Sequence, residues 1–137
     1  MIKNNLILLA TLSLASIPTL TNASDFGCKA LLCFAGGKGV AECQDTIKKV
    51  IRDMAKGKGF PHCSMVGVPS SDGSSSFVKT SMYTAVSPSP SKCHDGETKP
   101  FSQSLGYSRA YYCKVIEINI PADYAVDKEH QRQLFNY

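Results

Sequence analysis

Six cysteines are the residues of this chain best suited to chemistry, because a thiolate can be a redox group, a metal ligand or a nucleophile. No two of them have the Cys-x-x-Cys spacing of a redox-active dithiol. An even number of cysteines in a small exported chain is instead typical of a disulfide framework. We therefore expect structural disulfides among Cys28, Cys33, Cys43, Cys63, Cys93 and Cys113.

Two histidines stand directly beside cysteines, which raises the alternative of a metal site. His62 precedes Cys63 and His94 follows Cys93, so in each case a single loop carries both types of ligand. The paired short spacings of structural zinc sites are missing, however. We interpret these histidines as polar neighbours of disulfides and predict neither a metal nor a cofactor.

A hydrolytic site is the other chemistry to weigh. His62, His94 and His130 accompany many serines, but the chain has no Gly-x-Ser-x-Gly elbow. Glu42 fits a general acid on a glycosidase-like helix, although a carboxylate at a helix start more often stabilises the helix dipole. The stretch "GGKG" at 36–39 lacks the hydroxyl residue of a phosphate loop and is interpreted as a turn between helices. We predict no catalytic residues and a protein that is not an enzyme.

The N-terminal sequence predicts export. A positively charged start is followed by an apolar run at 6–20 and by the small residues "TNA" ending at Ala23, the pattern of a secretory signal peptide. The apolar run is shorter than the roughly 20 residues that span a bilayer. We therefore expect residues 1–23 to be a signal peptide and residues 24–137 to form a single disulfide-rich domain without a membrane span. The compartment is expected to be oxidising, either outside the cell or a periplasm.

The charge of the chain gives no reason to expect a nucleic-acid partner. The formal net charge is +4, and the basic residues at 48–52 are balanced by Asp45 and Asp53 on the same segment. Tryptophan is absent, and no stripe of interleaved aromatic and basic residues is present. These features disfavour a groove for single-stranded nucleic acid.

Hydrophobic periodicity predicts a helical hairpin over residues 25–63. Its first helix ends at Gly36 and Gly37 and is apolar nearly all round, so we expect it to be buried. Its second helix, at 41–56, is amphipathic. The apolar face of the second helix consists of Cys43, Ile47, Val50, Ile51 and Met54.

The remainder of the chain is predicted to contain loops and β structure. Stretches rich in serine and proline at 68–76 and 87–104 are expected to be flexible loops. Residues 109–120 alternate and are rich in aromatic and β-branched side chains, which predicts a strand. The segment 77–86 fits a strand or a helix, and 123–135 suggests a short helix. The predicted fold is a small disulfide-stapled α+β domain with a mainly helical N-terminal half, formed by an antiparallel helical hairpin, and a short β element near the C-terminus.

The hairpin suggests one disulfide pairing among the fifteen that six cysteines allow. Antiparallel helices bring Cys33, at the end of the first helix, toward Cys43, at the start of the second. The returning chain "GKGFPHC" then carries Cys63 back toward Cys28. The hypothesis is therefore Cys28–Cys63 and Cys33–Cys43, which leaves Cys93–Cys113 to tie the proline-rich loop to the last strand.

The N-terminal half also resembles the TrbM/KikA family of conjugal-transfer proteins. The matching features are "CKALLCFAGG" at 28–37, "AEC" at 41–43, the basic amphipathic helix "QDTIKKVIRDM" and the closing "FPHC" at 60–63. The chain departs from the family pattern after its third cysteine, where "QD" replaces a proline, and in the second helix, where "VI" replaces an aromatic residue. The resemblance covers residues 26–63 and carries over no catalytic residue.

The resemblance implies an accessory protein of plasmid conjugation in the periplasm of a Gram-negative bacterium, encoded with a type IV secretion and mating-pair apparatus. We expect a non-enzymatic binding or assembly factor whose partners are protein components of that apparatus. The loop around Lys38 or the region of Tyr111 and Tyr112 are candidate contact surfaces, although the tyrosines also fit strand packing. The alternatives are a small periplasmic hydrolase, which would depend on Glu42 and the two cysteine-adjacent histidines, and a plasmid-borne toxin or inhibitor.

Overall fold

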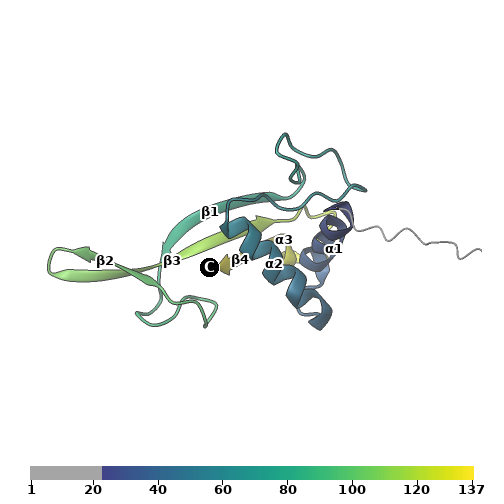
Figure 1. Cartoon of the computed structure of the whole chain (residues 1–137). Helices are drawn as coiled ribbons and strands as arrows, with labels where there is room; N and C mark the ends of the chain where they lie inside the picture. The colour runs from purple at the N-terminus through teal and green to yellow at the C-terminus, as the bar shows by residue number, and fades with distance from the viewer. Residues whose placement is uncertain (1–22) are drawn as a thin grey trace, which may run out of the picture.

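The computed structural model describes residues 23–137, with side chains from Phe26 onward. The signal-peptide prediction for 1–23 lies outside the described residues except at Ala23, the first residue of α1. The structure has an α+β fold in which two helices come first and an antiparallel sheet follows (Figure 1). The elements are α1 (Ala23–Gly36), a 3-10 helix η1 (Ala41–Cys43), α2 (Gln44–Ala55), β1 (Lys79–Val86), β2 (Phe101–Leu105), β3 (Ser108–Asn119), α3 (Lys128–Gln131) and β4 (Arg132–Asn136).

The long helices pack against one face of the sheet and form most of the core. In α2 the buried side chains Ile47, Val50 and Met54 follow the predicted apolar periodicity. The prediction that α1 is buried all round is wrong at Leu32, which is 73% exposed. Because α1 is covered only on the side that faces α2 and the sheet, a residue on its outer side remains in solvent. The core residues of α1 are Ala30, Leu31, Cys33, Phe34 and Ala35.

The sheet is built around β3, which pairs with every other strand. β1 pairs with one edge of β3, whereas β2 and β4 pair in succession along its other edge. Successive side chains of β3 point to opposite faces. Ile116 and Ile118 therefore join the core under the helices, while Glu117 lies on the opposite face, as the alternation of 109–120 predicted.

The β content is larger than the single short element that the sequence predicts, because the sheet has four strands. The segment 77–86, for which helix and strand were both open, contains the strand β1. The predicted loop 87–104 is wrong at its end, where 101–105 form β2. The predicted helix at 123–135 is also wrong, because only 128–131 are helical and β4 follows directly.

The core links the helices to β4 through aromatic packing. The Phe34 ring is fully buried and makes edge contacts with Phe60 at 5.3 Å and with Phe135 at 5.6 Å between centroids. Gln133 on β4, also buried, donates from Nε2 to the backbone carbonyls of Phe34 and His130. These hydrogen bonds satisfy the amide nitrogen of Gln133 inside an apolar core, whereas its Oε1 atom is buried without a partner among the described residues.

The cysteines form the disulfides Cys28–Cys63, Cys33–Cys43 and Cys93–Cys113. These are the pairs suggested by the hairpin. The first two close α1 against the chain on either side of α2, and the third ties the loop before β2 to the middle of β3. The disulfides therefore fix both the helical hairpin and the position of the loop over the sheet.

A close backbone contact next to the first disulfide yields a stability prediction. A Cβ at Gly27 overlaps the backbone carbonyl of His62, whereas a Cβ at Gly39 meets no heavy atom within 4 Å. We expect Gly27→Ala to separate α1 from the 61–63 segment and to lower the free energy of unfolding by about 2 kcal/mol or more. Gly39→Ala, the matched control, is expected to change it by less than about 0.5 kcal/mol.

The measurement is denaturant unfolding of both variants with the disulfides intact. Equal stability of Gly27→Ala and Gly39→Ala would contradict the close packing of α1 on this segment.

Candidate functional site

A cleft beside α2 gathers polar side chains from three parts of the chain. It has a volume of about 670 Å³ and lies between the start of α1, the second half of α2 and the loop that follows α2. Phe26 and Val50 contribute to its apolar wall. Its volume lies in the range of small-ligand sites, roughly 300–1,000 Å³. The ionisable and hydroxyl residues that line it are Lys49, Asp53, Lys58, His62, Asp72 and Ser74.

The charges inside the cleft compensate one another. Lys49 Nζ lies 2.7 Å from Asp53 Oδ2, and this hydrogen bond holds the pKa of Asp53 below its usual value, with further help from nearby Lys58. Hydrogen bonds from the hydroxyl and the backbone N–H of Ser74 likewise lower the pKa of Asp72. Both carboxylates are therefore ionised at neutral pH, and neither is poised to act as a general acid.

The residues considered for hydrolysis lie in different parts of the molecule. His62 lines the cleft, and its Nδ1 atom is buried without a hydrogen-bond partner among the described residues. Glu42 is exposed in η1, and His94 lines a separate cavity of about 220 Å³ on the sheet. His130 pairs with Asp127, whose Oδ1 lies 2.7 Å from Nδ1 of the imidazole. The structure does not bring these side chains together into one site.

The cysteines offer no free thiolate for a metal. All of them are oxidised to disulfides. Across residues 23–137, no group of three or more histidine, cysteine, aspartate or glutamate side chains is placed to hold a metal ion. The two histidines next to cysteines therefore lie beside disulfides.

A polar cluster on the sheet face away from the helices escaped the sequence analysis. Glu117 on β3 accepts hydrogen bonds from Nε and Nη2 of Arg132 on β4, at 3.0 and 3.1 Å. Asn119 and the hydroxyl of Tyr83 on β1 also donate to this carboxylate, at 3.2 and 3.3 Å. The bonds from Arg132 and Asn119 hold the pKa of Glu117 below its usual value. The cluster depends on strand register, so no local sequence motif marks it.

A two-stranded projection carries several exposed apolar side chains. We call it the β arm and define it as residues 101–112. It consists of β2 and the first part of β3, and it extends away from the helices (Figure 1). β1 reaches β3 only as far as Tyr112, so the arm has no third strand among the described residues. Its turn contains Gly106, whose φ of 64° favours glycine, and the fully exposed Tyr107.

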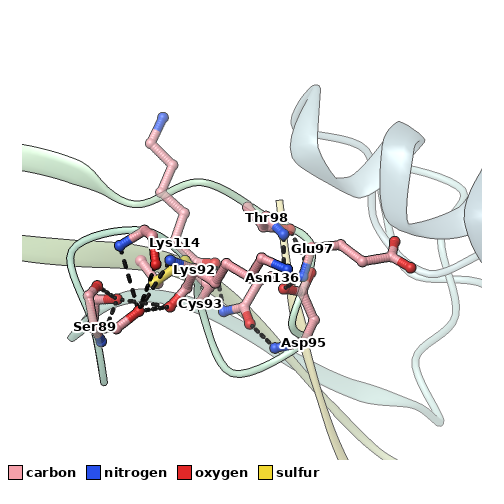
Figure 2. Close-up of a disulfide and its surroundings, with 11 residues drawn as sticks. Ser89, Lys92, Cys93, Asp95, Glu97, Thr98, Lys114 and Asn136 are labelled. Atoms are coloured by element: carbon pink, nitrogen blue, oxygen red, sulfur yellow. Dashed lines mark hydrogen bonds between the residues drawn. A yellow bond between two sulfur atoms is a disulfide. The ribbon is translucent and has the colours of Figure 1, made fainter.

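The base of the β arm is anchored to the sheet. The disulfide Cys93–Cys113 joins the preceding loop to β3 directly beside the arm (Figure 2). The backbone N–H of Asp95 donates to the side chain of Asn136 on β4 at 3.2 Å, and Asn136 donates to the carbonyl of Lys114 at the same distance. The loop, β3 and β4 are therefore connected where the arm begins.

The two faces of the β arm differ in polarity. Phe101 and Leu105 share a face with Tyr112, and the Phe101 and Tyr112 rings lie 5.8 Å apart. Gln103 lies between Phe101 and Leu105 on this face, and Ser102 and Ser104 lie on the opposite face with Tyr111 and Arg109. Phe101 and Leu105 remain 43% and 53% exposed, so the apolar face is left open to solvent.

The candidate contact residues of the sequence analysis are separated in the structure. Tyr111 and Tyr112 belong to the β arm, on opposite faces of β3. Lys38 lies in the turn between α1 and η1, with its ammonium group 5.9 Å from the centre of the Phe135 ring. The apolar surface of the β arm is formed by both of its strands. Of these, β2 was not predicted from the sequence.

Comparison with family models, with curated proteins and with solved structures finds no match to the chain. Within residues 23–137, no helix combines the length and the apolar character that crossing a bilayer requires.

The Glu117–Arg132 pair predicts a pH-dependent coupling between β3 and β4. Because the pKa of Glu117 is lowered, the ion pair stabilises the folded state fully above the usual carboxyl pKa. This stabilisation is lost as the pH falls through the lowered value. We expect a double-mutant cycle of Glu117→Gln and Arg132→Gln to give a stabilising coupling at about pH 7 and none once the carboxylate is protonated, at about pH 2. The measurement is urea unfolding of the four proteins at both pH values. A coupling that is independent of pH contradicts the assignment to this ion pair.

Proposed function

We propose that this chain is an exported accessory protein of plasmid conjugation that acts in the periplasm as a non-enzymatic binding or assembly factor. The cysteine-rich hairpin at 26–63, which resembles the TrbM/KikA family, supports the link to conjugation. The observation that carries the binding role is the β arm, which holds an open apolar face at a fixed place beyond the core.

The disulfides support the compartment. Three intramolecular disulfides are compatible with an exported protein in an oxidising environment. The choice of the periplasm as the compartment rests on the resemblance to the TrbM/KikA family.

The anchoring of the β arm supports a role in recognition. An isolated two-stranded hairpin is only marginally stable in water. Here the Cys93–Cys113 disulfide and the pairing of β3 with β1 and β4 hold the base of the arm. The exposed side chains are therefore presented with little loss of backbone freedom on binding, which favours affinity.

A hydrolase remains the second candidate because His62 lies in the same cleft as Asp72 and Ser74. Under this alternative, His62→Ala abolishes function without loss of folding. Under the binding hypothesis, His62→Ala is tolerated and changes in the β arm are not.

The test is the transfer frequency of a plasmid from which the gene has been deleted, with complementation in trans. Deletion is expected to lower transfer, and the wild-type gene is expected to restore it. The double variant Leu105→Ser/Tyr107→Ser is expected to restore transfer at least about tenfold less well, because truncating central apolar contacts removes much of the binding energy. The matched control, Met65→Ser/Val68→Ser, changes two apolar residues that are similarly exposed outside the arm and is expected to restore transfer fully.

Immunoblots of the periplasmic fraction check that all variants accumulate equally. Unchanged transfer after deletion would remove the assignment to conjugation. Full activity of the arm variant in a strain that requires the gene would remove the binding role of the arm. Loss of activity in His62→Ala alone would favour the hydrolase.

A further inference from the structure

We propose that the free edge of β2 binds an extended segment of a partner protein in which apolar and acidic side chains alternate. The proposal deepens the binding role proposed above and names the chemistry of the partner. The segment would add to the β arm as a third strand.

The outer edge of β2 is open. Within the described part of the chain, β2 pairs only with β3. Natural sheets usually protect such an edge with charged residues, proline or a bulge. The sequence of β2, Phe-Ser-Gln-Ser-Leu, contains none of these residue types, and its register with β3 is uninterrupted from Phe101 to Leu105. The backbone groups on the outer side of β2 are thus available for strand addition, a common mode of peptide recognition.

The two faces of the β arm offer different side chains to an added strand. An added strand continues the alternation of the sheet, so its side chains lie alternately beside Phe101, Gln103 and Leu105 on one face and beside Ser102 and Ser104 on the other. Apolar side chains fit the first face. Arg109 lies opposite Ser104 and is exposed on the second face, where an acidic side chain fits.

The β arm carries positive charge, because Arg109 is the one charged residue within 101–112. Between residues 98 and 116 the chain contains Lys99, Arg109 and Lys114 but no aspartate or glutamate, and the three basic residues are exposed. The nearest carboxylates in sequence are Glu97, before the arm, and Glu117, which accepts hydrogen bonds from Arg132. Asp95 also precedes the arm and accepts hydrogen bonds from the backbone of Glu97 and Thr98. Charge complementarity therefore selects an acidic partner.

The arrangement of the helices favours a protein segment over a bilayer. The apolar residues of the β arm lie on the same sheet face as Ile116 and Ile118, which is the face that α1 and α2 cover. The helices cover this face beyond the base of the arm, and the arm extends away from them (Figure 1). A flat surface approaching this face would meet the helices, whereas a single strand can lie along the edge of β2.

The probe is a blocked octapeptide of alternating valine and glutamate. It is added to the ¹⁵N-labelled exported domain, residues 24–137. We expect the peptide to shift the amide resonances of 101–105 and to slow their hydrogen exchange. An octapeptide of alternating valine and lysine is expected to bind at least about tenfold more weakly, because like charges oppose its approach. The double variant Lys99→Glu/Arg109→Glu is expected to reverse this preference.

The matched control for charge is Lys48→Glu/Arg52→Glu, which alters two exposed basic residues of α2 and is expected to keep the wild-type preference. Equal binding of both peptides, or shifts confined to residues outside the β arm, would overturn the proposal. Binding of the arm to phosphatidylglycerol vesicles without binding of the glutamate peptide would also overturn it, in favour of a membrane partner. These results concern the purified protein alone, so they are independent of whether deletion of the gene affects conjugation.

Discussion

The packing of Phe34 against the sheet is the interaction on which the arrangement of the rest of the chain depends. Its ring meets Phe60 from the segment after α2 and Phe135 from β4, and its carbonyl accepts a hydrogen bond from buried Gln133. One residue of α1 thereby contacts two segments that are distant from it in sequence. Because β4 is held in this way, it occupies one edge of β3 near the helices, and only the far end of that edge is left for β2.

The disulfides add to the stability that this small core provides. A core of this size provides a net stability of only about 5–15 kcal/mol, and each disulfide typically contributes about 2–4 kcal/mol. Cys28–Cys63 and Cys33–Cys43 close the helices against the segment that carries Phe60. Cys93–Cys113 acts at the other end of the sheet, where the loop before β2 would otherwise be free to move away from β3. The β arm therefore projects from a base that is fixed covalently.

The extent to which this structure could be predicted from sequence follows from the range of the interactions involved. The periodicity of α2 and the alternation of β3 are local, and both predicted the correct element. The periodicity of α2 also predicted its buried face. β2 and β4 were missed because Phe-Ser-Gln-Ser-Leu and Arg-Gln-Leu-Phe-Asn have weak β patterns and become strands by pairing with β3. Gln133 also obscures the alternation of β4, because a polar residue stands at a buried position. Its burial depends on the hydrogen bond that it donates to a backbone carbonyl of α1.

The same distinction applies to the functional surfaces. The sequence analysis indicated His62, which lines the cleft, and Tyr112, which lies on the β arm, but it could not predict their surroundings. The Glu117 cluster was not indicated at all, because it is assembled from three strands through their register. A local motif search finds chemistry that is carried by neighbours in sequence, and this molecule places most of its polar clusters between strands.

The balance of charge differs between the two surfaces and favours the β arm for the proposed partner binding. In the cleft, Lys49 is paired with Asp53, and Asp72 is satisfied by Ser74, so a charged ligand would have to replace contacts that already exist. On the β arm, Arg109 has no carboxylate nearby in sequence, the edge of β2 has no added strand, and Phe101 and Leu105 are left partly in water. Binding at the arm would satisfy the backbone groups, cover the apolar side chains and compensate the charge without breaking an internal contact. The arm is therefore the surface on which a partner gains most.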